Sequence, residues 1–128
     1  MILDSCFVIA LEREAKRKIQ GPALNFLSQH PSESFQITFT VSGELACGDS
    51  MAQKAEWKRL LQPFHVLPWS IEISWRYGES FRALKQKGKL IGTNDLWIAS
   101  TALAHDETLV TNNLSEFSRI PGLKILTF

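Results

Sequence analysis

Three acidic residues, Asp4, Glu44 and Asp95, stand where expected secondary-structure elements begin or end. Asp4 closes the first apolar run, Glu44 follows the second, and Asp95 opens a late amphipathic stretch. Carboxylate oxygens are the ligands that Mg²⁺ and Mn²⁺ prefer in proteins. Clustered carboxylates repel one another, and a bound divalent cation relieves that cost. Such a cation can polarise a phosphoryl oxygen and generate hydroxide from water, so these acids indicate metal-assisted chemistry on a phosphoryl group.

Each of these acids also has a simpler structural explanation. Asp4 can cap a helix that starts at the next residue, because aspartate is a good N-cap. We expect Ser42 to cap the following helix, which would place Glu44 in its first turn, where the helix dipole favours an acid. Asp95 would likewise lie near the start of its helix. Taken one at a time the acids indicate caps; taken together, at one edge of a sheet, they indicate a metal site.

The chain alternates between short apolar runs and longer amphipathic stretches. The expected strands are 1–4, 36–40, 64–68, 108–111 and 124–126. The expected helices are 7–20, 22–29, 42–62 with a possible break at Gly48, 70–87 and 94–104. Strands separated by helices require crossover connections, so the pattern predicts an α/β fold, a single-domain α/β/α sandwich with a mostly parallel central sheet. In such sheets ligands bind outside the carboxyl ends of the strands, which is where the three acids are expected.

Length and composition fit one globular domain over residues 1–128. Hydrophobic residues make up 45 % of the 128 residues, charged residues 21 %, and the net charge is +1. This near-neutral total does not indicate a nucleic-acid-binding protein, although it is compatible with an acidic pit inside a basic rim. Basic runs at 16–18 and around 85–89 could form such a rim, or could be solvated helix faces.

The two cysteines and the N-terminus bear on the cellular compartment. Cys6 and Cys47 form no CxxC pair and no zinc-type cluster, so we expect two free, largely buried thiols in a reducing environment. No apolar stretch reaches the length of a membrane span, and the first residues lack the basic region of a signal peptide. These features predict a cytoplasmic protein with no membrane partner.

Polar residues follow the fourth expected strand, in the segment Leu-Val-Thr-Asn-Asn-Leu-Ser-Glu-Phe at 109–117. A turn leading into a short helix explains them structurally, because Asn and Ser favour such positions. Chemically, Thr111 and Asn113 could orient a water or a phosphate without adding charge.

Four segments together resemble a known family. They are Met-Ile-Leu-Asp-Ser at the start, Ser-Gly-Glu-Leu-Ala-Cys-Gly after the second strand, Asn-Asp-Leu-Trp-Ile-Ala in the late helix, and the 109–117 segment. Their order and spacing resemble the PIN domain and, more narrowly, the VapC-type toxins of type II toxin–antitoxin modules, from residue 1 to about 126. The resemblance implies a Mg²⁺- or Mn²⁺-dependent endoribonuclease that acts on RNA. It also implies an antitoxin protein that blocks the site and a homodimer.

The resemblance also assigns site residues. The family's three acids fall on Asp4, Glu44 and Asp95, as metal ligands and catalytic residues. At the fourth position Asn113 stands where many relatives have aspartate, and Glu116, three residues on, could supply the missing charge. A site with only three carboxylates would bind one metal firmly and a second only with substrate.

The start of the chain departs from the family's usual Asp-Thr-Asn. Ser5 can keep the hydroxyl contact, whereas Cys6 loses the amide. We therefore take Ser5 and Thr111 as additional candidates beside Asn113. The early helices are expected to carry the apolar groove that an antitoxin would occupy.

Other interpretations fit less well. A haloacid-dehalogenase-like phosphatase needs an aspartate where Cys6 stands, and a receiver domain needs an acidic pair and a late lysine that are absent. A PIN-like scaffold that binds RNA or protein without cutting would be marked by loss of the acids. A housekeeping PIN nuclease that is no toxin stays open on sequence alone.

Overall fold

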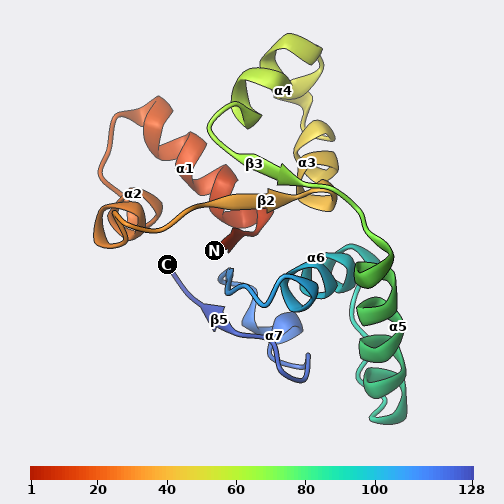
Figure 1. Ribbon diagram of the computed structural model, residues 1–128. Helices are drawn as coiled ribbons and strands as arrows, with labels where there is room; N and C mark the ends of the chain where they lie inside the picture. The colour runs from red at the N-terminus through yellow and green to blue at the C-terminus, as the bar shows by residue number, and fades with distance from the viewer.

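The computed structural model describes residues 1–128 as a three-layer α/β arrangement (Figure 1). The strands are β1 (Ile2–Leu3), β2 (Gln36–Thr38), β3 (His65–Leu67), β4 (Leu109–Val110) and β5 (Ile125–Leu126). The helices are α1 (Ser5–Arg17), α2 (Pro22–Gln29), α3 (Phe39–Ala46), the 3₁₀ turn η1 (Asp49–Met51), α4 (Lys54–Leu61), α5 (Ile71–Gln86), α6 (Thr93–Ala104) and α7 (Leu114–Phe117). In Figure 1, α4 lies above β2 and β3 in the view, and α6 and α7 lie below them, near β5. No helix is long and apolar enough to cross a membrane.

All strand pairs in the sheet are parallel, in the order β3-β2-β1-β4-β5. The chain builds outward from β1 to β2 and β3, then crosses back to place β4 on the other side of β1. The order therefore reverses between β1 and β4, where Leu3 pairs with Val110. In open parallel sheets the crevice at the carboxyl ends of two such strands is the usual ligand site. Asp4 and Thr111 are the residues that directly follow this pair.

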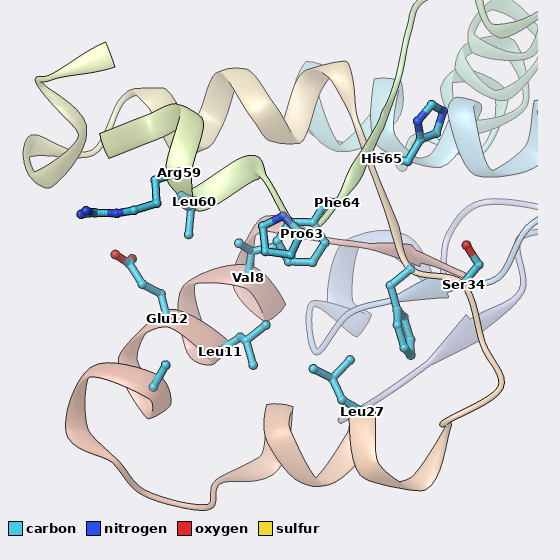
Figure 2. A pocket seen from close by; sticks show the side chains of 12 residues that line it. Val8, Leu11, Glu12, Leu27, Ser34, Arg59, Leu60, Pro63, Phe64 and His65 are labelled. Carbon is cyan, nitrogen blue, oxygen red and sulfur yellow. The ribbon is translucent and has the colours of Figure 1, made fainter. Parts of the chain in front are cut away.

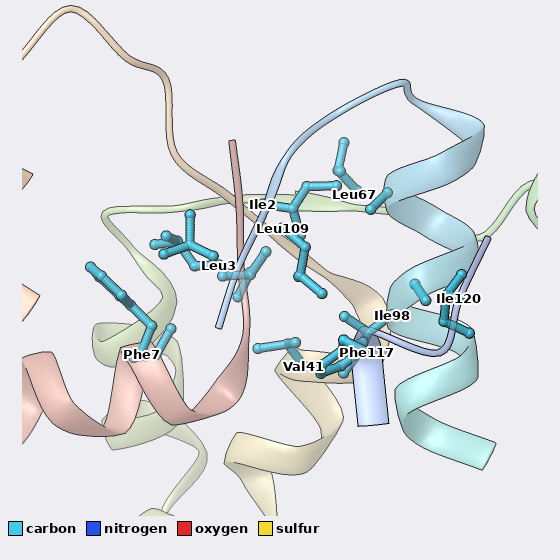
Figure 3. Packing of buried hydrophobic residues seen from close by; sticks show 14 of the residues in the cluster. Ile2, Leu3, Phe7, Val41, Leu67, Ile98, Leu109, Phe117 and Ile120 are labelled. Carbon is cyan, nitrogen blue, oxygen red and sulfur yellow. The ribbon is translucent and has the colours of Figure 1, made fainter. Parts of the chain in front are cut away.

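The central strands are short, and their side chains are fully buried. Ile2, Leu3, Leu109 and Val110 have no exposed surface, and they belong to a cluster of 19 buried hydrophobic residues (Figure 3). Phe117 of α7 and residues of α6 complete this cluster. Burial on both faces is what parallel strands covered by helices require, so the continuous apolar runs in the sequence were a sound signal for strands.

The second strand ends two residues earlier than the sequence suggests. Residues 36–40 read as a strand, but Thr38 caps α3, because its Oγ1 accepts a hydrogen bond from the backbone N–H of Val41 at 3.1 Å. The expected cap, Ser42, instead lies inside α3 and donates its hydroxyl to the carbonyl of Phe39 at 2.7 Å. Glu44 is consequently in the second half of α3 and not in its first turn. The dipole argument for Glu44 was wrong, because capping by Thr38 outweighs the strand preference of the residues after it.

The expected long helix at 42–62 is three elements. α3 ends at Ala46, η1 follows the break at Gly48, and α4 starts at Lys54. Trp57 of α4 joins the pieces by donating its indole N–H to the carbonyl of Ser42 at 2.9 Å. The first helix also differs from expectation: it starts at Ser5, because Asp4 caps it, and it ends at Arg17, because Lys18 adopts a left-handed conformation with φ of 55°.

A buried glutamate on α1 fixes the start of α2. Glu14 is 6 % exposed, and its two carboxylate oxygens accept the backbone N–H groups of Ala23 at 3.0 Å and Leu24 at 2.9 Å. The N-cap residue of α2, Gly21, provides no side-chain cap, and an added Cβ there would meet the Glu14 carboxylate at 2.4 Å. Glu14 thus supplies the cap from a neighbouring helix.

We predict that Glu14→Ala lowers the free energy of unfolding by about 2–3 kcal/mol, because two buried N–H groups lose a charged acceptor. Urea denaturation followed by circular dichroism measures this change. Glu33→Ala is the control, since Glu33 is exposed and its carboxylate has no partner. Equal stability of the two variants would contradict the capping role of Glu14.

Candidate active site

Asp4 lies at the point where the strand order reverses, and its carboxylate is fixed from both sides. The residue is 4 % exposed, and its Oδ2 accepts the hydroxyl of Thr111 at 2.7 Å, which links the ends of β1 and β4. Its Oδ1 accepts the backbone N–H of Ser5 at 2.7 Å and the Ser5 hydroxyl at 3.4 Å. Asp4 is therefore the N-cap of α1, as one sequence interpretation predicted, and it also lies at the strand-order reversal. The two interpretations are compatible, because a carboxylate has about four lone-pair positions.

Cys6 adds a further donor to Asp4. Its thiol lies 3.3 Å from Asp4 Oδ2 and 3.6 Å from Thr111 Oγ1. Burial raises the pKa of the Cys6 thiol, so it stays protonated and can donate to the carboxylate. Cys6 therefore retains a weak donor where the sequence comparison expected only the loss of an amide. Both cysteines are free, but Cys47 is exposed, so the expectation that both are buried was wrong for Cys47.

Glu44 reaches the same edge of the sheet from α3. Its Oε1 accepts the side-chain amide of Asn94 at 3.2 Å, whereas its Oε2 is buried and has no hydrogen-bond partner. A buried carboxylate oxygen without a partner is unfavourable unless something else compensates it. Asn94 was not among the predicted site residues. Its position next to Asp95 at the start of the late helix was the available signal.

Asp95 lies in the first turn of α6, and the negative charges of three other acids act on it. Burial, and then the charges of Asp4, Glu44 and Glu116, raise the pKa of Asp95 to about 6. No cation opposes these effects, and none of the ion pairs in the structure includes any of the four acids. Asp4, Glu44 and Glu116 therefore lie near enough to Asp95 for their charges to act on it.

Asn113 occupies the gap between β4 and Asp95. Its backbone N–H donates to Thr111 Oγ1 at 3.0 Å, and its amide lies at hydrogen-bond distance from Asp95 Oδ2, at 3.5 Å. The Ser115 hydroxyl donates to the amide oxygen of Asn113 at 3.1 Å and orients it. Asn113 thus presents a donor to the acidic cluster, whereas an aspartate there would add a fifth charge.

The acidic cluster fits a hard divalent cation by its chemistry. It combines all-oxygen donors, an unpartnered buried oxygen on Glu44 and mutual repulsion at Asp95. No three side chains among His, Cys, Asp and Glu already stand in a metal-binding arrangement. The residues that would hold the ion are Asp4, Glu44 and Asp95, with Glu116 as the next acid.

One tryptophan packs between the helices near the site, and two others are exposed. Trp97 stacks near Tyr77 of α5 with a centroid distance of 4.2 Å and meets Phe39 of α3 edge-on at 6.1 Å. It braces the helices that carry Glu44 and Asp95. Trp69 and Trp75 are 55 % and 59 % exposed, so they are not core residues.

The protein is an α/β protein with a parallel sheet and an acidic candidate site where the strand order reverses. Comparison with known families makes the assignment specific: residues 1–123 match the PIN domain. The chain belongs to the PIN domain family.

Known proteins of this family resemble the whole chain. One relative, "Ribonuclease VapC1" of Rickettsia felis, is 41 % identical over 136 aligned positions, which cover 99 % of this chain and 95 % of the relative. The structure of VapBC2 from Rickettsia felis, bound to a promoter DNA fragment, superposes with a TM-score of 0.80 at 29 % identity and covers 99 % of this chain and 97 % of that one. VapBC-1 from nontypeable Haemophilus influenzae gives a TM-score of 0.77 at 29 % identity, with coverage of 98 % and 96 %.

The raised pKa of Asp95 predicts a pH-dependent stability of the metal-free protein. Because the folded-state pKa of about 6 exceeds the ordinary value of 3.8, ionised Asp95 destabilises the fold above pH 6, and this penalty disappears as the pH falls towards 4. In EDTA at pH 7.5, Asp95→Asn should therefore be more stable than the wild type by about 1–2 kcal/mol, allowing for solvent screening. Urea unfolding of both proteins from pH 4.5 to 7.5 measures the difference.

The quantity to follow is the difference in free energy of unfolding between Asp95→Asn and the wild type, because the other acids titrate in both proteins. The stability advantage of Asp95→Asn should shrink below pH 6. An advantage that stayed constant with pH would show that the neighbouring acids do not act on Asp95.

Proposed function

We propose that this protein is a divalent-metal-dependent endoribonuclease and the toxin of a VapBC-type toxin–antitoxin pair. The observation that carries the proposal is that the charges of Asp4, at the strand-order reversal, and of Glu44 act on Asp95, with no cation paired to any of the three. The similarity of the chain to ribonucleases of the VapC type and to the VapBC structures supports this proposal.

The acids and their neighbours would have separate roles. Asp4, Glu44 and Asp95 would bind Mg²⁺ or Mn²⁺, with Glu116 as the next acid available. When bound, the ion would supply Lewis-acid polarisation of a phosphoryl oxygen and a more acidic water. Asn113 would donate its amide to a phosphate or water at the cluster, while Thr111 keeps Asp4 oriented across the two strands.

The position of Asn113 also bears on the number of metals. A neutral amide at the fourth position leaves less negative charge than the aspartate of many relatives. We infer that one metal binds firmly, and that a second binds only when a substrate phosphate contributes oxygens.

We predict that the purified protein cleaves single-stranded RNA with Mg²⁺ or Mn²⁺ and leaves it intact in EDTA. Attack of water on phosphorus should leave 5′-phosphate and 3′-hydroxyl ends, which end-labelling with and without phosphatase distinguishes. Asp4→Ala and Asp95→Ala should each lower the cleavage rate by at least about 100-fold, because each removes charge from the centre that stabilises the transition state.

Asp106→Ala is the matched control for these variants. Asp106 is an exposed aspartate that pairs only with Lys124, at the opposite end of β4. Undiminished cleavage by both Asp4→Ala and Asp95→Ala would refute the assignment of the site.

A hollow on the early helices is the proposed docking site of the antitoxin. It has a volume of about 600 Å³, and seven of its twelve lining residues are hydrophobic. Figure 2 shows Val8 and Leu11 of α1, Leu27 of α2 and Leu60 of α4 lining it, with Glu12 and Arg59 facing each other at one end. Apolar walls with a charged end suit an amphipathic segment of a partner protein. We therefore assign this hollow to the antitoxin.

We predict that Leu11→Arg and Leu27→Arg weaken binding of the antitoxin encoded beside this gene by at least about 10-fold, because a charge would be buried against its apolar face. Ile19→Arg is the control, since Ile19 is exposed just after α1 and does not line the hollow. Calorimetry with the purified pair measures affinity, and RNA cleavage confirms that the variants are folded. Unchanged affinity in both variants would place the antitoxin elsewhere.

The proposal also covers the domain organisation, location and oligomeric state of the protein. We take residues 1–128 as a single nuclease domain, the protein as cytoplasmic, and the functional toxin as a homodimer. Two alternatives are an RNA- or protein-binding scaffold and a housekeeping nuclease. RNA cleavage and its inhibition by an antitoxin distinguish both from a toxin. The scaffold would not cleave RNA, and the housekeeping nuclease would cleave it without an antitoxin to inhibit it.

A further inference from the structure

A second groove lies beside Glu44, between α1 and the segment formed by the end of α3 and η1. Its volume is about 330 Å³, and Glu44 is one of its lining residues, so the groove opens onto the candidate site. One wall comes from α1, and the other comes from residues 44–51. The apolar hollow assigned to the antitoxin is a neighbour, since Glu12 and Leu60 line both.

The α1 wall carries a continuous line of residues that begins at the site. Ser5, Ile9, Arg13 and Lys16 are spaced by four, four and three positions, so they share one face of the helix. Ser5 donates to Asp4, while Ile9, Arg13 and Lys16 line the groove. Arg13 lies two turns beyond Ser5, roughly 12 Å along the helix axis at 1.5 Å per residue. That is too far for the reacting phosphate and suits a neighbouring one.

The charges of the groove single out Arg13. Lys16 is already paired with Glu12, at 2.6 Å, and Glu44 belongs to the acidic cluster. Arg13 is exposed, and it forms no ion pair and no side-chain hydrogen bond in the structure. An unpaired guanidinium can bind a phosphate with two parallel hydrogen bonds. Of the two basic runs noted in the sequence, only Lys16 lines this groove, and Arg17 and Lys18 do not.

We propose that this groove is the path of the single-stranded RNA next to the cleaved bond, and that Arg13 is a positioning residue that binds a phosphate there. The proposal rests on the ribonuclease function proposed above. Ile9, Leu45 and Met51 give the groove apolar walls against which ribose and base edges can pack. Arg13 would then raise affinity for RNA without taking part in the chemical step.

Binding of a fluorescein-labelled single-stranded RNA, followed by anisotropy, tests Arg13 directly. The RNA is kept intact by placing all variants in an Asp95→Asn background. Arg13→Ala should raise Kd by about 5- to 10-fold, and the slope of log affinity against log salt should fall by about 0.7, the value for one phosphate contact on a single strand. Arg13→Lys should retain the salt slope and recover part of the affinity.

Arg17→Ala is the matched control, because Arg17 is an exposed arginine on the same helix, one turn farther from the site and outside the groove. It should change neither Kd nor the salt slope. With the active enzyme, Arg13→Ala should raise KM by a similar factor while kcat stays within about 2-fold, which a misfolded site would not produce.

The possible outcomes separate this proposal from the function on which it rests. If the wild type cleaves RNA but Arg13→Ala binds it normally, or no worse than Arg17→Ala, the groove proposal is overturned and the function stands. If Arg13→Ala weakens only the antitoxin complex, the groove belongs to the protein partner and the RNA path is wrong. If the wild type fails to cleave any RNA with Mg²⁺ or Mn²⁺, the function itself fails.

Discussion

The hydrogen bond between Asp4 and Thr111 joins the two strands at which the sheet reverses its order, and the site depends on it. It ties the end of β1 to the end of β4, while the other oxygen of the same carboxylate caps α1. One side chain therefore fixes the direction in which α1 leaves the sheet and one wall of the crevice. The backbone N–H of Asn113 donates to the same Thr111 oxygen, so this hydroxyl also positions the loop after β4. Asp4 is a structural cap and a candidate ligand at once, because a carboxylate can serve both uses.

The remaining acids reach this crevice from separate elements, and their meeting has an electrostatic cost. Glu44 comes from the second half of α3, Asp95 from the first turn of α6 and Glu116 from α7. Neutral amides, from Asn94 and Asn113, donate to Glu44 and Asp95. A fold selected for stability alone would place a lysine or arginine among these charges. The lack of one favours a site arranged for a cation that comes from solution.

The sequence was sufficient for the alternation of strands and helices and for the parallel sheet, because these depend on signals that are local and strong. Buried strands such as Ile2–Leu3 read as apolar runs, and an acid at the end of such a run is conspicuous. The boundaries failed where a cap competed with strand propensity, as at Thr38, and the first-turn position of Glu44 failed with them. Contacts between distant residues, such as Asn94 with Glu44 and Glu14 with the start of α2, leave no pattern in the sequence. The groove beside Arg13 was equally invisible, because it forms between α1 and residues 44–51.

The absence of any cation around Asp95 has a consequence for the order in which ligands arrive. Four uncompensated carboxylates attract a metal ion and repel a phosphodiester, so the metal-free crevice discourages RNA from entering. On the proposed function, metal and RNA would each strengthen the binding of the other by the same factor, as reciprocal linkage requires. Free magnesium would then act on the occupancy of the enzyme by its substrate as well as on its chemistry. A cell that lowered its free magnesium would leave the nuclease folded, more strained and largely empty of RNA.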